Sequence, residues 1–236
     1  MYPTSIWGWP LCLLRIYLTA CWFFVGSLIP LIVAIFRPFN VKNGYLYAAV
    51  CNRPILRILG IKLVIEGQIP SDKESIVFIG NHQSIVDLFV FPLCLPHNAI
   101  SIGKKSIRWV PIFGWVFWLS NHIFIDRKNK VRAVQAMDEA ARRLRSQKLS
   151  VMVFPEGTRS LTGKLGKFKK GAFHLAEQGP FPIVPMIASR YSNVLNLGRM
   201  NAGTIVVRIL PRISPPFQPM EKLMDQCFEL FEQNLQ

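Results

Sequence analysis

The feature that most constrains this chain is an uncharged apolar run near its start. Residues Ile16–Phe36 (IYLTACWFFVGSLIPLIVAIF) contain no Asp, Glu, Lys or Arg. A helix rises about 1.5 Å per residue, so this run would be about 31 Å long, close to the thickness of the bilayer hydrocarbon core. We therefore predict an N-terminal helix that attaches the chain to a membrane, either by spanning the bilayer or by entering one leaflet.

Two other interpretations of this run stay open. A cleaved signal peptide fits poorly, because no positive charge precedes Arg15 and no clear A-x-A site follows the run. A core helix of a soluble domain is the second alternative. A further apolar stretch, Tyr45–Val64, carries three basic residues that can reach lipid headgroups: Arg53, Arg57 and Lys62. We place the membrane-anchoring segment at residues 1–60.

The composition suits one domain with a membrane attachment. The chain has 236 residues, enough for one sizeable core, and at 51% hydrophobic it is too polar for a bundle of membrane helices. Its net charge of +15 indicates an anionic surface or substrate, but charge alone does not distinguish nucleic acid, lipid headgroups and carrier phosphates. The five cysteines include no CxxC pair, so neither a disulfide framework nor a zinc site is expected.

From about Lys62 onward, short apolar runs alternate with stretches of helical periodicity. Strands are predicted at residues 62–66, 75–79, 149–154, 182–188 and 205–210. Helices are predicted at residues 86–95, 130–147, 171–178 and 221–234. This alternation predicts an α/β domain over residues 61–236, with a largely parallel sheet flanked by helices.

A histidine and an aspartate follow the strand predicted at 75–79, in the sequence GNHQSIVD. His82 and Asp87 are five residues apart, so on one continuous helix they would point about 140° apart. They can meet if the helix begins between them, and Ser84 with Asp87 fits a capping box with Ser84 as N-cap. A carboxylate on one ring nitrogen would leave the other free to accept a proton. The alternative is a simple helix cap, with His82 as a loop residue.

A second polar cluster, Phe154–Ser160 (FPEGTRS), follows the strand predicted at 149–154. In a parallel sheet it emerges at the same edge as His82. Gly157 lets backbone approach a ligand, and Arg159 offers paired donors that suit a phosphate. Alternatively, Arg159 pairs with Glu156. The chain lacks the G-K-[ST] ending of a P-loop, the G-x-S-x-G elbow and H-E-x-x-H, so neither an acyl-serine nor a metal is expected.

Four blocks in this order resemble the lysophosphatidic acid acyltransferase family, also called 1-acylglycerol-3-phosphate acyltransferases. They are Asn81–Asp87 (N-H-x-x-x-x-D), Asn121–Arg127 (in the family, usually G-x-x-F-I-x-R), Phe154–Ser160 and Ile183–Met186. The resemblance covers about residues 75–190. Asn121 stands where the family often has glycine, but asparagine tolerates unusual backbone angles better than most residues.

The resemblance implies a role for each matching residue. His82 would be the general base and Asp87 would orient it. Basic residues would hold the acceptor phosphate: Arg159, one of Lys104 and Lys105, which lie in a further family-like segment between the first two blocks, and as a further candidate Arg127. Three residues of the FPEGTRS block would line the glycerol end: Glu156, Gly157 and Thr158. The acyl chain could lie in a tunnel built from Phe89, Phe91, Leu93, Ile112, Phe113, Trp115, Phe117 and Trp118.

The expected reaction moves a fatty acyl group from acyl-CoA or acyl-carrier protein to the sn-2 hydroxyl of 1-acylglycerol-3-phosphate, giving phosphatidic acid. No cofactor is expected beyond this acyl thioester donor, and the partners are membrane lipid and donor, without nucleic acid. The catalytic domain is expected at the cytoplasmic face of the membrane; the oligomeric state is not indicated. Two alternatives stay open: another lysophospholipid, glycerol-3-phosphate or lyso-aminolipid acceptor, and a non-enzymatic basic protein that binds membrane surfaces.

Overall fold

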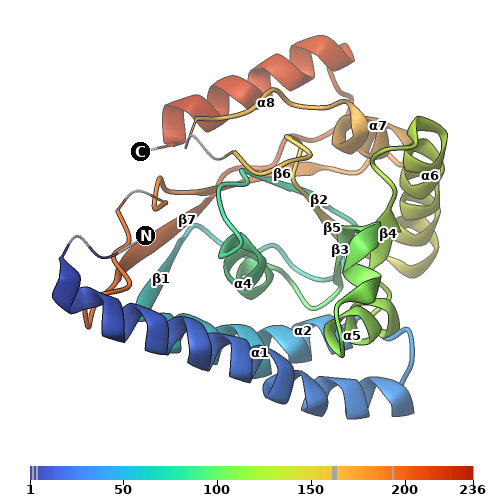
Figure 1. Ribbon diagram of the computed structural model, residues 1–236. Helices are drawn as coiled ribbons and strands as arrows, with labels where there is room; N and C mark the ends of the chain where they lie inside the picture. Colours follow the sequence, from blue (N-terminus) through green and yellow to red (C-terminus); the bar gives the residue numbers. More distant parts are fainter. Residues whose placement is uncertain (2, 4, 161–163, 193, 236) are drawn as a thin grey trace.

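A mixed sheet of seven strands forms the centre of the molecule in the residues that the structure describes (Figure 1). The structure is a computed structural model, and it describes residues 1–236 except 2, 4, 161–163, 193 and 236. The strand order is β1-β7-β6-β2-β5-β3-β4, and neighbouring strands are parallel except β6 and β7. The strands are β1 Ile61–Glu66, β2 Val77–Gly80, β3 Ala99–Lys104, β4 Ile123–Ile125, β5 Ser150–Val153, β6 Ile183–Ala188 and β7 Gly203–Ile209.

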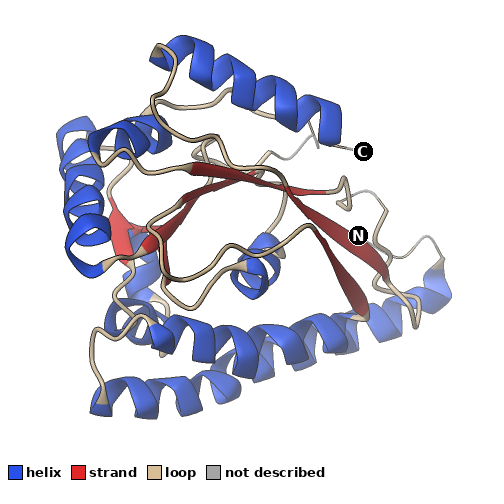
Figure 2. Ribbon diagram, turned by 180° about the vertical axis from the view of Figure 1, so that it is seen from behind, coloured by secondary structure: helices blue, strands red, loops and turns tan. Residues whose placement is uncertain are grey.

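Helices cover both faces of this sheet (Figures 1 and 2). One face carries α1 Trp9–Phe36, α2 Lys42–Tyr47, α3 Arg53–Leu59, α4 Asp87–Val90 and α5 Phe113–Leu119. The other carries α6 Lys130–Gln147, α7 Gly171–Gln178 and α8 Met220–Asn234. Successive strand residues alternate between the two cores: Phe78 packs in the core on the α1 side, and Val77 and Ile79 pack in the core on the α6 side. Burial on both faces explains why the central strands β2, β5 and β6 are mainly apolar along their whole length.

The predicted α/β fold with a largely parallel sheet is confirmed, and all five predicted strands are present within two residues of their expected bounds. The strands β3 and β4 and the helix α5 were not predicted. The helix predicted at 86–95 is wrong in its length: α4 ends at Val90, and a 3-10 turn follows over Phe91–Cys94. Pro92 explains this ending, because proline disfavours a helical conformation in the residue before it and lacks an N–H.

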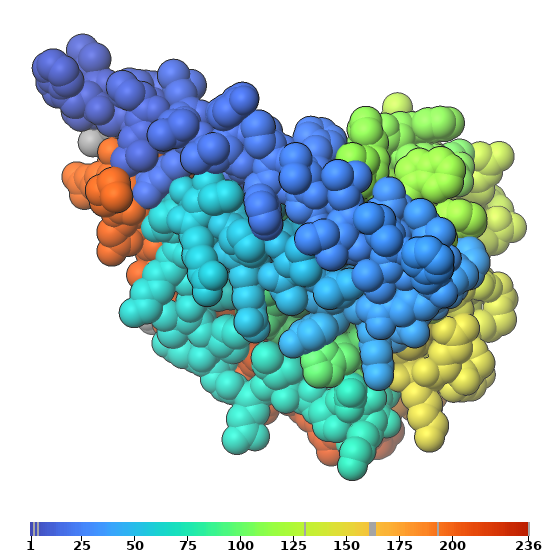
Figure 3. Space-filling view, turned by 90° about the horizontal axis from the view of Figure 1, so that it is seen from below, coloured from blue at the N-terminus to red at the C-terminus, as the bar shows by residue number. Residues whose placement is uncertain are grey.

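The apolar N-terminal run forms α1, which lies along the surface of the domain (Figure 3). Ile6–Phe36 is long and apolar enough to cross a membrane, and only 22% of its most apolar window is buried. The guanidinium of Arg15 is buried against the loop after β6, where it donates to the carbonyls of Leu197, Arg199 and Met200. Cys12 joins the same core as Phe78. Residues 1–60 therefore pack on the domain as well as presenting an apolar face outward.

Candidate active site

His82 and Asp87 meet in the turn between β2 and α4. The Nδ1 atom of His82 lies 2.8 Å from Oδ2 of Asp87. Asp87 is fully buried, whereas 11% of the His82 side chain is exposed. The prediction that the two side chains meet because a helix begins between them is confirmed. An ionised carboxylate can only accept, so in the neutral ring Nδ1 carries the proton and Nε2 is left as an acceptor.

The predicted capping box is wrong in its position. The helix α4 begins at Asp87 and its N-cap residue is Val86, which has no side-chain cap. Asp87 does reach back to the N–H of Ser84, at 2.9 Å, but the Ser84 hydroxyl accepts from Val86 instead of Asp87. The physical reason is that the Asp87 carboxylate accepts hydrogen bonds from the turn that precedes the helix, and this turn is complete before α4 begins.

The Asp87 carboxylate is held by four donors. Its Oδ2 atom accepts the ring N–H of His82 and the backbone N–H groups of Gln83, at 2.7 Å, and Ser84. Its Oδ1 atom accepts the hydroxyl of Tyr191, a fully buried residue that follows β6. Tyr191 was not predicted: it lies 104 residues from Asp87, and no local motif marks it.

The loop after β5 packs directly against His82, as expected for neighbouring parallel strands. The Phe154 ring stacks on the His82 ring, with 4.2 Å between centroids. Glu156 is buried and accepts the backbone N–H of His82 at 2.7 Å and that of Gly166 at 2.8 Å. Burial raises the pKa of Glu156, and these two hydrogen bonds oppose that rise. Glu156 therefore stabilises the histidine turn. Among the described residues, Glu156 does not pair with Arg159, so that alternative is not seen.

The predicted basic residues gather at the carboxyl ends of β3, β4 and β5. Arg127, just after β4, donates to the carbonyl of Gly157, which has a φ of +71°. Lys105 lies 3.7 Å from Asp126, whereas Lys104 ends β3 with its side chain exposed. Arg159 and Thr158 are exposed beside this cluster. The structure thus brings the predicted basic residues to one edge of the sheet, with the histidine.

Lys169 is a further basic residue at this edge, beyond the FPEGTRS block. A Cβ atom on Gly157 would lie 2.9 Å from the Lys169 ammonium, so Lys169 covers the same glycine that Arg127 contacts. Among the described residues, neither cation has a carboxylate partner within 4.0 Å. Two positive charges close to the same glycine favour the binding of an anion beside it.

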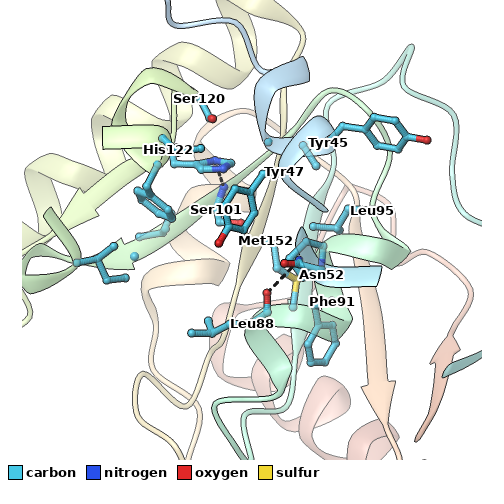
Figure 4. Close-up of a pocket in the computed structure, with 18 of the residues that line it drawn as sticks. Tyr45, Tyr47, Asn52, Leu88, Phe91, Leu95, Ser101, Ser120, His122 and Met152 are labelled. Atoms are coloured by element: carbon cyan, nitrogen blue, oxygen red, sulfur yellow. Dashed lines mark hydrogen bonds between the residues drawn. The ribbon is translucent and has the colours of Figure 1, made fainter. Parts of the chain in front are cut away.

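A largely apolar cavity is lined by residues of α2, α4, α5 and β3 (Figure 4). Asp87 and Phe154 line it at the dyad, and of the predicted tunnel residues Phe91, Phe113 and Phe117 line its walls. The opposite end carries Ser120 and His122 (Figure 4). His122 Nδ1 accepts the N–H of Ser101 at 3.0 Å, and burial lowers the pKa of His122 to about 4, so its ring stays neutral.

The other five predicted tunnel residues do not line this cavity. Phe89 and Leu93 pack in the core on the α1 side. Ile112, Trp115 and Trp118 line a shallow groove against Leu31 and Ile35 of α1. Trp115 and Trp118 are exposed there, on the outward side of α5. Asn121 adopts a left-handed conformation with a φ of +65°, in agreement with the tolerance of asparagine for unusual backbone angles.

Comparisons with known proteins place the chain among acyltransferases. The family profile described as Acyltransferase matches residues 61–189. A 1-acyl-sn-glycerol-3-phosphate acyltransferase of Haemophilus influenzae is 33% identical over 229 residues, covering 94% of each chain. One from Escherichia coli is 31% identical, covering 95% of this chain and 93% of its own. The crystal structure of the 1-acyl-sn-glycerophosphate (LPA) acyltransferase PlsC from Thermotoga maritima shares the fold, with a TM-score of 0.75 at 23% identity over 96% of this chain and 93% of that chain.

Proposed function

The chain belongs to the acyltransferase family, and we propose that it transfers a fatty acyl group from an acyl thioester to the sn-2 hydroxyl of 1-acylglycerol-3-phosphate, giving phosphatidic acid. The observation that carries this proposal is the His82–Asp87 pair, in which the buried carboxylate of Asp87 holds the histidine ring and Asp87 also lines an apolar cavity. Both relatives carry the name of this activity.

The proposed reaction needs one base and one proton return. Nε2 of His82 removes the proton of the acceptor hydroxyl as its oxygen bonds to the thioester carbonyl carbon. The carbon–sulfur bond then breaks, and the proton on His82 passes to the departing thiolate. Asp87 holds the ring and stabilises its charged form during this step. No cofactor takes part beyond acyl-CoA or acyl-carrier protein as the donor.

The substrates would enter from two sides of His82. The acyl chain of the donor would lie in the cavity lined by Phe91, Phe113 and Phe117. The phosphate of the acceptor would meet the basic cluster formed by Arg159, Arg127 and either Lys104 or Lys105. Glu156, Gly157 and Thr158 would border the glycerol, although the Glu156 oxygens already accept two backbone N–H groups.

The enzyme would work on the cytoplasmic face of a membrane with α1 lying in the interface. The outward side of α1 is apolar and exposed at Leu14, Leu18, Val25, Ile29 and Ile32. Its inward side is fastened to the domain by Arg15. A helix that is bound along the domain cannot cross the bilayer without immersing the domain, so we favour insertion into one leaflet. Residues 1–60 would provide this anchor and residues 61–236 the catalytic domain.

The direct test is an assay of purified full-length protein with several acceptors and donors. Lysophosphatidate should be acylated faster than glycerol-3-phosphate, lyso-aminolipids and other lysophospholipids. A faster reaction with one of those acceptors would keep the chemistry and change the substrate. The absence of transfer with every combination of acceptor and donor would favour the non-enzymatic membrane binder. That hypothesis gives the buried His82–Asp87 pair no role.

A further inference from the structure

Two side chains that flank His82, those of Asn81 and Gln83, bind the histidine turn to the end of β6 and the segment that follows it. The Asn81 amide donates to the carbonyl of Ala188 at 2.9 Å and accepts the N–H of the same residue at 2.8 Å. The Gln83 amide donates to the carbonyls of Ala188 and Ser189, at 3.1 and 2.8 Å. Asn81 and Gln83 are both buried, so water does not compete for these bonds.

This fastening delivers the Tyr191 hydroxyl to the buried carboxylate. Tyr191 is 1% exposed and donates to Oδ1 of Asp87, the oxygen that faces away from His82. Burial, and then the negative charge of Asp87, raise the pKa of Tyr191 well above its usual range. Its hydroxyl therefore stays protonated and remains a donor.

Resting on the function proposed above, we infer that Tyr191 is a positioning residue that sets the basicity of His82 through Asp87. A hydrogen bond to Oδ1 withdraws negative charge from the carboxylate and fixes its rotation, so that Oδ2 points at the ring. Without that bond, the carboxylate would attract the protonated ring more strongly. His82 would then hold its proton at higher pH and would be a usable base over a narrower range.

The ionisable groups around His82 come from three segments. Asp87 is on its own turn, Glu156 is in the loop after β5, and Tyr191 follows β6. Glu156 contacts the backbone of His82, whereas Tyr191 contacts neither the ring nor its backbone among the bonds described. The effect of Tyr191 on the ring is therefore transmitted by Asp87.

The test compares the pH dependence of kcat/KM in the full-length enzyme and in Tyr191→Phe. A hydrogen bond contributes about 1 kcal/mol and one pH unit corresponds to about 1.4 kcal/mol, so the acidic limb should move upward by about half a unit to one unit. KM for both substrates should be unchanged, because Tyr191 is proposed to touch neither. A lower melting temperature with an unmoved acidic limb would show a purely structural role and would overturn the inference.

Two further measurements separate this inference from other failures. In an Asp87→Asn background, Tyr191→Phe should produce no further shift, and an additive shift would contradict transmission through Asp87. If Tyr191→Phe does not fold, a fluorinated tyrosine at this position keeps the ring and strengthens the donor, and the limb should move to lower pH.

An NMR titration of the His82 ring follows the same shift without turnover. A moved midpoint in a protein that transfers no acyl group would uphold the link from Tyr191 to His82 and refute the proposed function. An unmoved midpoint in an active enzyme would refute the link alone.

Discussion

Arg159 is the exposed guanidinium that the proposed mechanism assigns to the acceptor phosphate. It lies at the sheet edge that also carries Arg127 and Lys104, and it has no ion pair or hydrogen bond among the described residues. A phosphate clamp binds the ground state and the transition state alike. Arg159→Ala should therefore raise KM for the lyso-acceptor more than it lowers kcat.

Arg159→Lys should recover only part of the loss, because an ammonium group cannot grip two phosphate oxygens in one plane. Arg212→Ala is the matched control, since Arg212 is an exposed arginine whose partner is the exposed Glu74. Steady-state kinetics at varied acceptor concentration would reveal the difference. An unchanged acceptor KM in Arg159→Ala would show that the phosphate lies elsewhere.

Glu156 links the two loops that form the site, and its substitution tests that link. Glu156→Gln keeps the shape but places an amide where two backbone N–H groups need acceptors, so one donor is left unsatisfied. Leaving a buried donor unpaired costs about 1–3 kcal/mol. We expect a lower melting temperature and slower transfer together. Glu229→Gln, on the exposed side of α8, is the control and should change neither. Normal stability in Glu156→Gln would show that the two hydrogen bonds accepted by Glu156 do not stabilise the site.

At the scale of elements, periodicity and strand composition predicted most of the sheet but missed its smaller parts. The strands β2, β5 and β6 were predictable because each is a short, mainly apolar run buried on both faces, and β7 was predictable from its apolar residues Ile205–Val207. β4 has three residues and β3 contains Ser101 and Gly103, so neither gives that signal. The helix α5 is rich in aromatic residues and is stabilised by packing on α1, which sequence periodicity does not report.

The candidate site likewise has residues that could be predicted from the sequence and residues that could not. His82 and Asp87 were predictable because a motif places them in one turn after a strand. Glu156 was named for substrate binding, but its contacts with His82 and Gly166 depend on how two loops pack. Tyr191 could not be predicted from the sequence, because only the pairing of β2 with β6 brings its segment to the His82–Asp87 pair.

The outward face of α1 is the element that we expect to contact lipid. Val25 is 60% exposed on that face, and Val131 is 66% exposed on α6, across the sheet. Val25→Glu places a charge where lipid would be, so it should reduce binding to lipid vesicles in a flotation assay. Val131→Glu makes the same change away from α1 and should leave binding intact. Equal binding by both variants would refute the proposed orientation.

Deletion of residues 1–60 is a poorer test than these single changes. Cys12, Ile55 and Leu59 are buried in the core that also contains Phe78, and Arg15 supplies donors to three carbonyls after β6. Their removal would expose apolar strand residues. A truncated chain would therefore lose stability as well as membrane attachment, and the two losses could not be told apart by activity alone.

At the scale of the whole molecule, we propose that an apolar face and an excess of positive charge act together at the membrane. The net charge of +15 favours anionic lipid, but salt screens that attraction, with a Debye length of about 3 Å at 1 M. The apolar contact of α1 is not screened. The protein should therefore sediment with membranes and stay there through a high-salt wash, with release by detergent. Release by salt alone would show that the attachment is mainly electrostatic.

The central claim is that this chain is an acyltransferase whose chemistry depends on His82. The most direct measurement is phosphatidic acid formation by purified full-length enzyme from lysophosphatidate and an acyl thioester, in parallel with His82→Ala. General bases contribute about 10²- to 10⁴-fold, so the variant should lose at least a hundredfold in turnover while it keeps its melting temperature and its binding to vesicles. Turnover within a few-fold of the unchanged enzyme, from a folded His82→Ala protein, would contradict the account.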